Sequence, residues 1–149
     1  MERTLILVKP DGVQRGLTFE ILGRLERRGL KLAALKLLRV TAELAGEHYK
    51  EHVGKGFYNG LIEYITSAPI VAAVFEGPNA IAAARATLGK TNPVQADAGT
   101  IRGDLGIETG RNLVHGSDGP ESAAREIALF FHADEVQAYA RDIDKWVVE

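Results

Sequence analysis

The chain has 149 residues, of which 46% are hydrophobic and 26% are charged, and it contains no cysteine. This composition is typical of a globular protein, so we expect a single domain over residues 1–149 with its own hydrophobic core. The lack of cysteine excludes disulfides, thiolate metal sites and cysteine nucleophiles, and the net charge of −2 gives no reason to expect nucleic acid as the main partner. The chain starts directly in a strand-like segment and has no apolar run of membrane-spanning length, so we expect a cytoplasmic protein without a membrane partner.

The first half of the chain is expected to contain two strands and three helices. Short apolar runs predict the strands, and Thr18 and Thr41 are expected to cap the first two helices. Gly29 is expected to end the first helix in a left-handed conformation. The expected elements are a strand over 4–8, a turn over 9–12, a helix over 19–28, a strand over 30–40, a helix from 42 to about 50 and a helix over 57–66.

The second half is expected to contain two more strands. Residues 70–75 carry no polar side chain, which is typical of a strand covered on both faces. The other expected elements are a helix over 79–88, a long loop over 89–112, a strand over 113–115, a helix from an Asp118 cap to about 131 and a helix over 134–140. This order predicts a ferredoxin-like split βαβ fold of the α/β class, an α+β sandwich in which helices cover a four-stranded antiparallel sheet.

The segment 111–118, with the sequence Arg-Asn-Leu-Val-His-Gly-Ser-Asp, carries the strongest functional signal. It places His115 between a short apolar pair and Gly116, close to an arginine, an amide and a carboxylate. This arrangement is typical of a side chain at a strand end that faces open space, where histidine acts as a nucleophile or base. The alternative is a structural histidine whose ring only makes hydrogen bonds within the turn.

Two helices carry a charge at or beside their apolar stripe. Arg85 shares a face with Ile81, Ala84 and Leu88, and Glu126 borders the apolar face of the next helix after His115. A carboxylate there can bind one ring nitrogen of the histidine and leave the other free to attack. Long side chains that reach solvent from the edge of the stripe are the alternative.

Several cations and neutral donors fall at the ends of the same predicted elements. Lys9 follows the first strand, Arg102 and Arg111 belong to the long loop, and Thr91 and Asn112 add uncharged donors. Phosphoryl transfer needs cations and donors that converge on one site, because the reaction depends on positioning the phosphates and on neutralising their charge. With 18 lysines and arginines in the chain, ordinary surface cations are the alternative.

Three other patterns suggest different chemistry more weakly. Gly89-Lys90-Thr91 resembles the end of a P-loop, but a helix precedes it and Pro93 follows. His48 to His52 matches the H-x-x-E-H zinc pattern, with Glu63 as a possible third ligand. Ser117, His115 and Asp118 are too close in sequence to align as a hydrolase triad, and helix capping explains Asp118 better.

The chain resembles the nucleoside diphosphate kinase family over essentially its whole length. The resemblance is carried by 2–16 with its Lys-Pro-Asp-Gly turn, by Thr91-Asn92-Pro93 with 99–104, by 112–118 and by 121–127. It implies a ping-pong reaction in which the γ-phosphate of a nucleoside triphosphate, mainly ATP, moves to a histidine and then to a nucleoside diphosphate. His115 matches the phosphorylated nucleophile, and Glu126 matches the residue that orients it.

The resemblance also implies the remaining site residues. Phe57 matches the aromatic that stacks on the base, Leu61 packs beside it, and Thr109 lies at the other face of the base. Mg²⁺ is expected on the nucleotide phosphates rather than in a protein cage. The positions that match phosphate or ribose contacts, or that steady the histidine, are Lys9, Tyr49, Arg85, Thr91, Arg102 and Asn112.

The chain departs from the family pattern in the base-stacking loop and at one further position. Gly56 stands where the family usually has proline, so we expect a more mobile loop, and Tyr58 and Asn59 are unusual there. Thr109 replaces an apolar residue, with a modest expected effect on nucleotide affinity. The family forms homo-oligomers, and the tail 146–149 resembles that of the hexameric type more than the tetrameric. A non-catalytic ferredoxin-like module that binds nucleotide or RNA is the alternative function.

Overall fold

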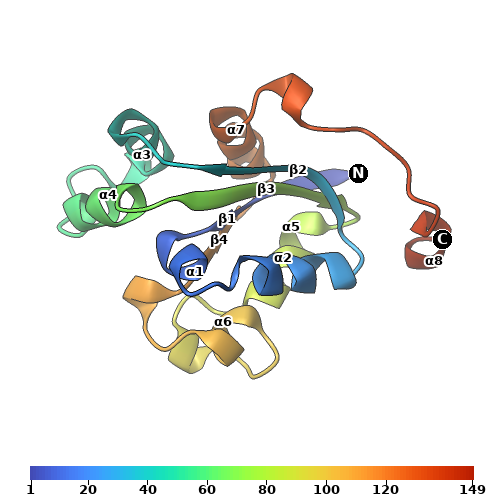
Figure 1. The fold of residues 1–149 in the computed structure, drawn as a ribbon, viewed down its shortest axis with the longest axis horizontal. Helices are drawn as coiled ribbons and strands as arrows, with labels where there is room; N and C mark the ends of the chain where they lie inside the picture. Colours follow the sequence, from blue (N-terminus) through green and yellow to red (C-terminus); the bar gives the residue numbers. More distant parts are fainter.

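The computed structural model describes all residues 1–149 and contains one four-stranded sheet (Figure 1). The spatial order of the strands is β2-β3-β1-β4, and every neighbouring pair is antiparallel. The strands are β1 (Glu2–Val8), β2 (Lys31–Leu38), β3 (Ile70–Gly77) and β4 (Val114–Gly116). The short β4 forms one edge of the sheet, and it pairs with the C-terminal half of β1.

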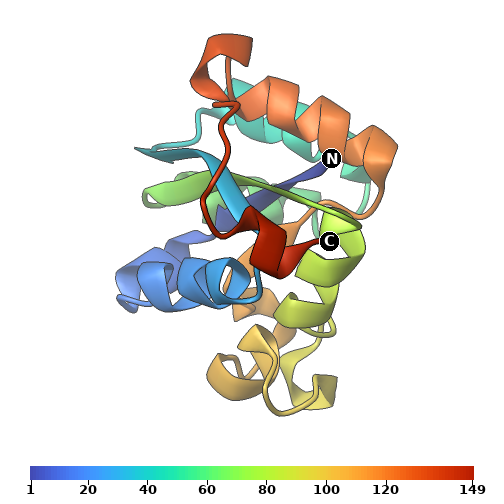
Figure 2. The ribbon, with the colours of Figure 1, turned by 90° about the vertical axis from the view of Figure 1, so that its right-hand side faces the viewer.

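Helices cover both faces of the sheet (Figures 1 and 2). One face carries α1 (Pro10–Gln14), α2 (Thr18–Arg27), α5 (Ala80–Leu88) and α6 (Ile101–Leu105), and the other carries α3 (Ala42–His48), α4 (Tyr58–Thr66) and α7 (Pro120–Phe130). The short turns are η1 (Lys50–His52), η2 (Pro93–Gln95), η3 (Thr109–Arg111) and η4 (Ala133–Glu135), and α8 (Asp144–Val147) ends the chain. The expected antiparallel sheet covered by helices is confirmed.

The alternation of side chains along β1 divides the core into two parts. Ile6 and Val8 pack in the core under α2 and α5, whereas Leu5 and Leu7 pack under α3, α4 and α7. Successive side chains of a strand point to opposite faces, so a continuous apolar run is stable only when both faces are covered. No helix in the structure is long and apolar enough to cross a membrane.

Of the expected helix ends, two are confirmed and two are wrong. Thr41 caps α3, because its hydroxyl accepts a hydrogen bond from the Leu44 amide at 3.1 Å, and Gly29 has a positive φ of 112° after α2. Thr18 is not a cap: it lies inside α2, which begins after Leu17 without a side-chain cap. Gly119, not Asp118, is the N-cap of α7.

Three other segments differ from expectation. The turn expected over 9–12 is the start of helix α1, and the loop expected over 89–112 contains α6 and two short turns. The helix expected over 134–140 is wrong, because only η4 forms there. The Gln137 amide instead donates to the Ala33 carbonyl of β2 at 2.8 Å, so a tertiary contact replaces the helical hydrogen bonds.

Candidate active site

His115 is the central residue of β4, between buried Val114 and Gly116. Since Val114 packs in the core under α5, strand alternation directs His115 to the opposite face, toward α3 and α7. Its side chain is 25% exposed. A Cβ at position 116 would lie 2.8 Å from Leu88 Cδ1, so glycine there allows α5 to pack against the strand that carries the histidine.

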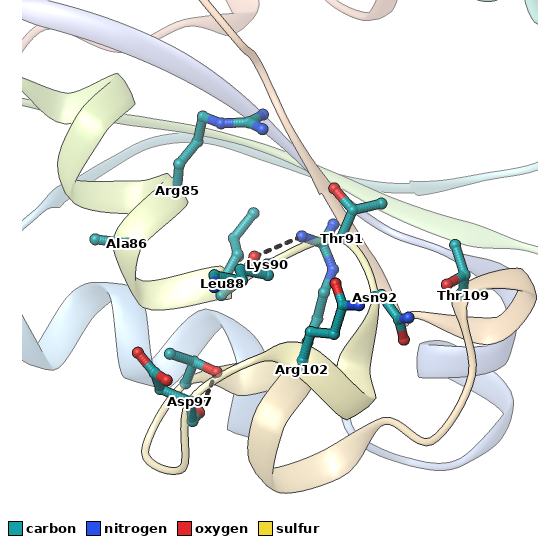
Figure 3. A pocket seen from close by; sticks show the side chains of 12 residues that line it. Arg85, Ala86, Leu88, Lys90, Thr91, Asn92, Asp97, Arg102 and Thr109 are labelled. Atoms are coloured by element: carbon teal, nitrogen blue, oxygen red, sulfur yellow. Dashed lines mark hydrogen bonds between the residues drawn. The ribbon is translucent and has the colours of Figure 1, made fainter.

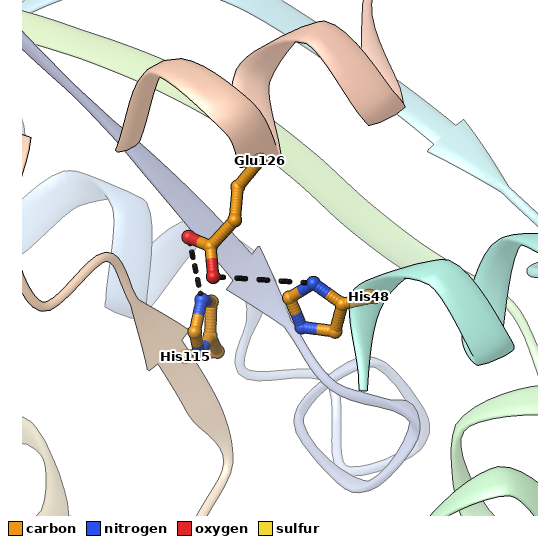
Figure 4. A group of neighbouring side chains, drawn as sticks. All are labelled: His48, His115 and Glu126. Atoms are coloured by element: carbon orange, nitrogen blue, oxygen red, sulfur yellow. Dashed lines mark hydrogen bonds and ion pairs between the residues drawn. The ribbon is translucent and has the colours of Figure 1, made fainter. Parts of the chain in front are cut away.

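Glu126 of α7 binds one nitrogen of the His115 ring (Figure 4). Its Oε1 lies 3.1 Å from His115 Nε2 and accepts a 2.7 Å hydrogen bond from the Ser117 hydroxyl. Burial raises the pKa of Glu126, but the hydrogen bonds from His115 and Ser117 and the nearby charge of His115 outweigh it, so the pKa lies below its ordinary value. An ionised carboxylate only accepts, so Nε2 carries the ring proton and Nδ1 keeps a free lone pair.

A pocket of about 280 Å³ lies in front of His115 and collects most of the expected site residues. Lys9 Nζ donates to Asn112 Oδ1 at 2.8 Å, and Asn112 Nδ2 donates to the Thr91 carbonyl at 2.9 Å. Burial, and then the charge of Arg102, lower the pKa of Lys9 to about 8. The expected residues that line this pocket are Lys9, Tyr49, Arg85, Thr91, Arg102, Asn112, His115 and Glu126.

Arg102 is buried, and its guanidinium holds three segments together. It donates to the carbonyls of Asn112 at 3.2 Å, Gly89 at 2.9 Å and Val114 at 2.5 Å. Burial, with a smaller effect of Arg85, lowers its pKa to about 10, so it remains charged at neutral pH. A guanidinium has five N–H groups, which leaves two for a ligand.

A second hollow of about 790 Å³ adjoins the first and shares Arg85, Thr91 and Arg102 with it (Figure 3). Thr109 lines this second hollow. Arg85 follows the alternative of a long side chain that reaches solvent from the apolar stripe: it is exposed, and its guanidinium donates to the Gly116 carbonyl at 3.1 Å. Two adjoining hollows lined by cations in front of an oriented histidine suit a polyphosphate ligand.

Comparison with known proteins agrees with this geometry. The model of the nucleoside diphosphate kinase family matches residues 2–136. The nucleoside diphosphate kinase of Carboxydothermus hydrogenoformans is 58% identical over 149 residues, which cover both chains completely. The chain belongs to the nucleoside diphosphate kinase family.

Relatives from distant organisms share the family and the fold. The nucleoside diphosphate kinase of Archaeoglobus fulgidus is 54% identical over 149 residues, 100% of this chain and 99% of its own. The structure of a halophilic nucleoside diphosphate kinase from Halobacterium salinarum in complex with CDP has a TM-score of 0.97 at 50% identity, and that of a family protein from Babesia bovis has 0.96 at 46%. Both alignments cover 99% of each chain. The protein is therefore a kinase that acts on nucleotides.

The structure places three residues expected at the site outside both hollows. Phe57 is 54% exposed, and its ring lies 5.3 Å from that of His52, which lines the pocket. Leu61 is half-buried on α4 and lines neither hollow. Arg111, grouped with the phosphate cations from the sequence, stacks 4.5 Å from the Tyr64 ring instead.

Sequence reasoning missed the role of Ser117 and the residues that fix the backbone before His115. In the sequence Ser117 stood out only as a member of an unsuitable hydrolase triad, but its buried hydroxyl donates to Glu126 and accepts a hydrogen bond from the Leu5 amide at 3.1 Å. Leu113 has a positive φ of 76°, an uncommon conformation for leucine, and Asp11 Oδ2 accepts its amide at 3.1 Å. The Tyr64 hydroxyl holds the other oxygen of Asp11. Asp11, the second residue of α1, therefore supports the backbone just before the strand that carries His115.

The weaker sequence patterns do not form the sites they suggested. Gly89 lies at the end of α5 and its carbonyl accepts from Arg102, so no P-loop forms. His52 contacts Phe57 and Lys55, while His48 turns away from it toward His115, so the two histidines of the H-x-x-E-H pattern do not pair with Glu63. Burial lowers the pKa of His48 to about 3, with the charge of His115 as the next cause, so this ring is neutral.

We expect Gly56→Pro to stabilise the base-stacking loop. The Gly56 amide donates no backbone hydrogen bond, its φ is not positive, and a Cβ there would meet nothing within 4 Å. Proline should then stabilise the fold by about 0.4–1 kcal/mol and lower KM for nucleotides, because the unbound loop has less freedom to lose. Thermal unfolding and initial rates check this. The matched control is Gly54→Pro, which should destabilise, since Gly54 has a φ of 86°. Equal effects of the two changes would contradict the explanation.

Proposed function

We propose that this kinase moves the γ-phosphoryl group from a nucleoside triphosphate, mainly ATP, to a nucleoside diphosphate by way of a phosphohistidine at His115. The Nδ1 lone pair attacks the γ-phosphorus, the bond from that phosphorus to the β,γ-bridging oxygen breaks, and a nucleoside diphosphate leaves. A terminal oxygen of a second diphosphate then attacks the phosphorylated histidine, and the Nδ1–P bond breaks. The observation that carries this proposal is the 3.1 Å contact of His115 Nε2 with Glu126, which leaves Nδ1 as the free nucleophile.

The residues around His115 support the charge change of each half-reaction. Attack by Nδ1 makes the ring cationic, and the Glu126 carboxylate stabilises that charge through Nε2–H. Lys9, Arg85 and Arg102 line the pocket in which the phosphates would lie, where they neutralise the transferring group. Tyr49, Thr91 and Asn112 supply donors for the phosphates and the ribose hydroxyl. We assign base stacking to Phe57, with Leu61 and Thr109 beside the base, so specificity for the base should be broad.

The metal is proposed to arrive on the nucleotide. Most polar groups that line the pocket are cations or N–H and O–H donors, and Glu126, its buried carboxylate, is held by His115 and Ser117. Mg²⁺ prefers oxygen ligands and keeps several waters, so this donor set fits a metal that the phosphates carry rather than a protein cage. Bound there, Mg²⁺ would neutralise phosphate charge and shape the polyphosphate for attack.

The chain is proposed to act as a single domain that assembles into a homo-oligomer. The outer edge of β2, which residues 136–140 hydrogen-bond at Leu32 and Ala33, exposes Leu35 and Leu37 beyond them, and Phe19, 79% exposed, lines a hollow with these two leucines. Exposed strand edges with apolar side chains favour pairing with another copy. We favour a hexamer over a tetramer because the tail through Trp146 resembles that of hexameric members, and sedimentation tests this choice. We also propose a cytoplasmic location for this kinase.

Initial-rate kinetics test the proposed mechanism. A phosphoenzyme that forms before the acceptor binds gives parallel lines when reciprocal rate is plotted against reciprocal ATP concentration at several concentrations of CDP. Intersecting lines would instead indicate direct transfer in a ternary complex. The alternative of a non-catalytic RNA-binding module finds no support, because the one aromatic residue of the strands, Phe75, is only 1% exposed.

The lowered pKa of Lys9 predicts an alkaline limb in the pH profile. As pH rises through about 8, the free enzyme loses the ammonium charge that attracts phosphate, so kcat/KM should fall above this pH. Lys9→Arg keeps its charge over this range, so its profile should lack the limb even where its activity is lower. A limb that persists in Lys9→Arg, or a wild-type profile that stays flat to about pH 9, would contradict the assignment.

A further inference from the structure

His48, the last residue of α3, meets the catalytic pair from the side (Figure 4). Its side chain is 3% exposed, and its Nδ1 has no hydrogen-bond partner. Glu126 Oε2 lies 4.0 Å from Nδ1, and the His48 ring stands edge-on to His115 with 4.9 Å between centroids. Buried polar atoms almost always have a hydrogen-bond partner or another ligand, so the unpartnered Nδ1 indicates that something further binds there.

We propose that His48, His115 and Glu126 form a binding site for a divalent transition metal such as Zn²⁺, and that the metal switches the kinase off. One ligand atom from each residue, a ring nitrogen or a carboxylate oxygen, lies within 4.8 Å of the other two. Two imidazoles and a carboxylate are a ligand set that zinc uses, with a fourth position open to water. The exposed edge of His115 in the pocket leaves such a position.

To reach the ligand spacing of zinc, the three groups must move together by up to about 1.4 Å. Tetrahedral zinc with bonds of about 2.1 Å places its ligand atoms roughly 3.4 Å apart. His115 Nε2 lies 3.1 Å from Glu126 Oε1, His48 Nδ1 lies 4.0 Å from Glu126 Oε2, and one ligand atom from each of the three residues lies within 4.8 Å of the other two. His48 also lines the pocket, so a metal can reach it from solvent. Mg²⁺ would not compete, because it selects oxygen over imidazole ligands.

The metal would act by changing the tautomer of His115. A neutral imidazole has one N–H and one lone pair. In the metal-free enzyme Nε2 bears the hydrogen, which it donates to Glu126, and Nδ1 bears the lone pair. When a metal takes a lone pair at Nε2, the ring proton must move to Nδ1, with no net proton gained or lost. Nδ1 then has no lone pair with which to attack phosphorus. This consequence rests on the proposed role of His115, whereas the metal site itself does not.

Cobalt substitution tests the site directly. We expect Co²⁺ added to the apoprotein to give the intense visible bands of tetrahedral cobalt at one equivalent per chain. His48→Gln and His115→Asn should abolish these bands, and the matched control His52→Gln should keep them. No tetrahedral spectrum in the wild type would overturn the site. Bands that survive in His48→Gln would also overturn the site. Bands that disappear in His52→Gln would overturn it as well, because they would indicate that cobalt binds the two histidines of the H-x-x-E-H pattern.

Two further measurements separate the metal site from its consequence. With excess Mg²⁺ and ATP, His48→Gln should need at least about 10-fold more Zn²⁺ than the wild type to lose half of its own metal-free rate of phosphorylation. Because that variant can fail to fold, ¹⁵N NMR of the wild type serves as the second test: Zn²⁺ should move the His115 ring proton from Nε2 to Nδ1, and an unchanged tautomer overturns the switch. If His115→Asn instead remained an active kinase, the proposed function would fail while the cobalt site could still stand.

Discussion

Replacing His115 by asparagine is expected to lower kcat/KM for phosphoryl transfer at least about 10³-fold. Asparagine is close to histidine in size and can still donate a hydrogen bond toward Glu126, so the surroundings should persist. An amide nitrogen has no basic lone pair, however, and cannot form the phosphoenzyme. A coupled assay for triphosphate formation checks the rate, and nucleotide binding measured by calorimetry should change little.

The matched control for this change is His132→Asn. His132 is exposed at the start of η4 and lines neither hollow, so it should be dispensable for catalysis. If His115→Asn kept more than a few per cent of the activity while His132→Asn lost it, the nucleophile would have to be sought elsewhere.

Replacing Glu126 by glutamine is expected to lower kcat by about 10- to 100-fold. Glutamine keeps an acceptor oxygen for His115 and Ser117, so the tautomer and the ring orientation should survive. What is lost is the negative charge 3.1 Å from Nε2, which stabilises the imidazole as it becomes cationic during attack. Charge-assisted hydrogen bonds contribute about 1.5–3 kcal/mol, and each 1.4 kcal/mol corresponds to a factor of ten in rate. KM should change little, because the carboxylate is buried and its hydrogen bonds go to His115 and Ser117.

Glu121→Gln is the control, since Glu121 is exposed in the first turn of the same helix. A wild-type kcat for Glu126→Gln would show that the buried carboxylate does not assist the transfer. A large rise in KM with unchanged kcat would place its role in nucleotide binding instead.

The sequence predicted the sheet and the main helices because each has a strong local signal. Apolar runs marked all four strands, and a helical spacing of apolar residues marked α4, α5 and α7. The errors fall where local signals are weak or tertiary contacts decide. In α6, Thr100 accepts the Gly103 amide at 3.0 Å, a cap that polar neighbours and a length of five residues concealed. Residues 136–140 run beside β2, where the Gln137 amide and the Tyr139 hydroxyl donate to carbonyls of that strand. A periodic pattern in the sequence cannot predict such tertiary contacts.

The candidate site was predictable where residue type implied chemistry, and less so where only packing brings residues together. His115, Glu126 and the cations of the pocket stood out as charges or donors at the ends of apolar segments. Ser117 did not, because a serine before a helix is so often a turn or capping residue. His48 escaped for a different reason: its place beside His115 depends on how α3 packs against α7, and the sequence pattern paired it with His52 instead.

Locating the phosphoryl group on the enzyme tests the role of His115 most directly. After incubation with [γ-³²P]ATP and Mg²⁺ and removal of nucleotide, we expect acid-labile, base-stable label on His115. ³¹P NMR should place the phosphoryl group at Nδ1, and the label should pass completely to added CDP. Label on any other residue, or an unlabelled enzyme that still forms CTP, would contradict this role.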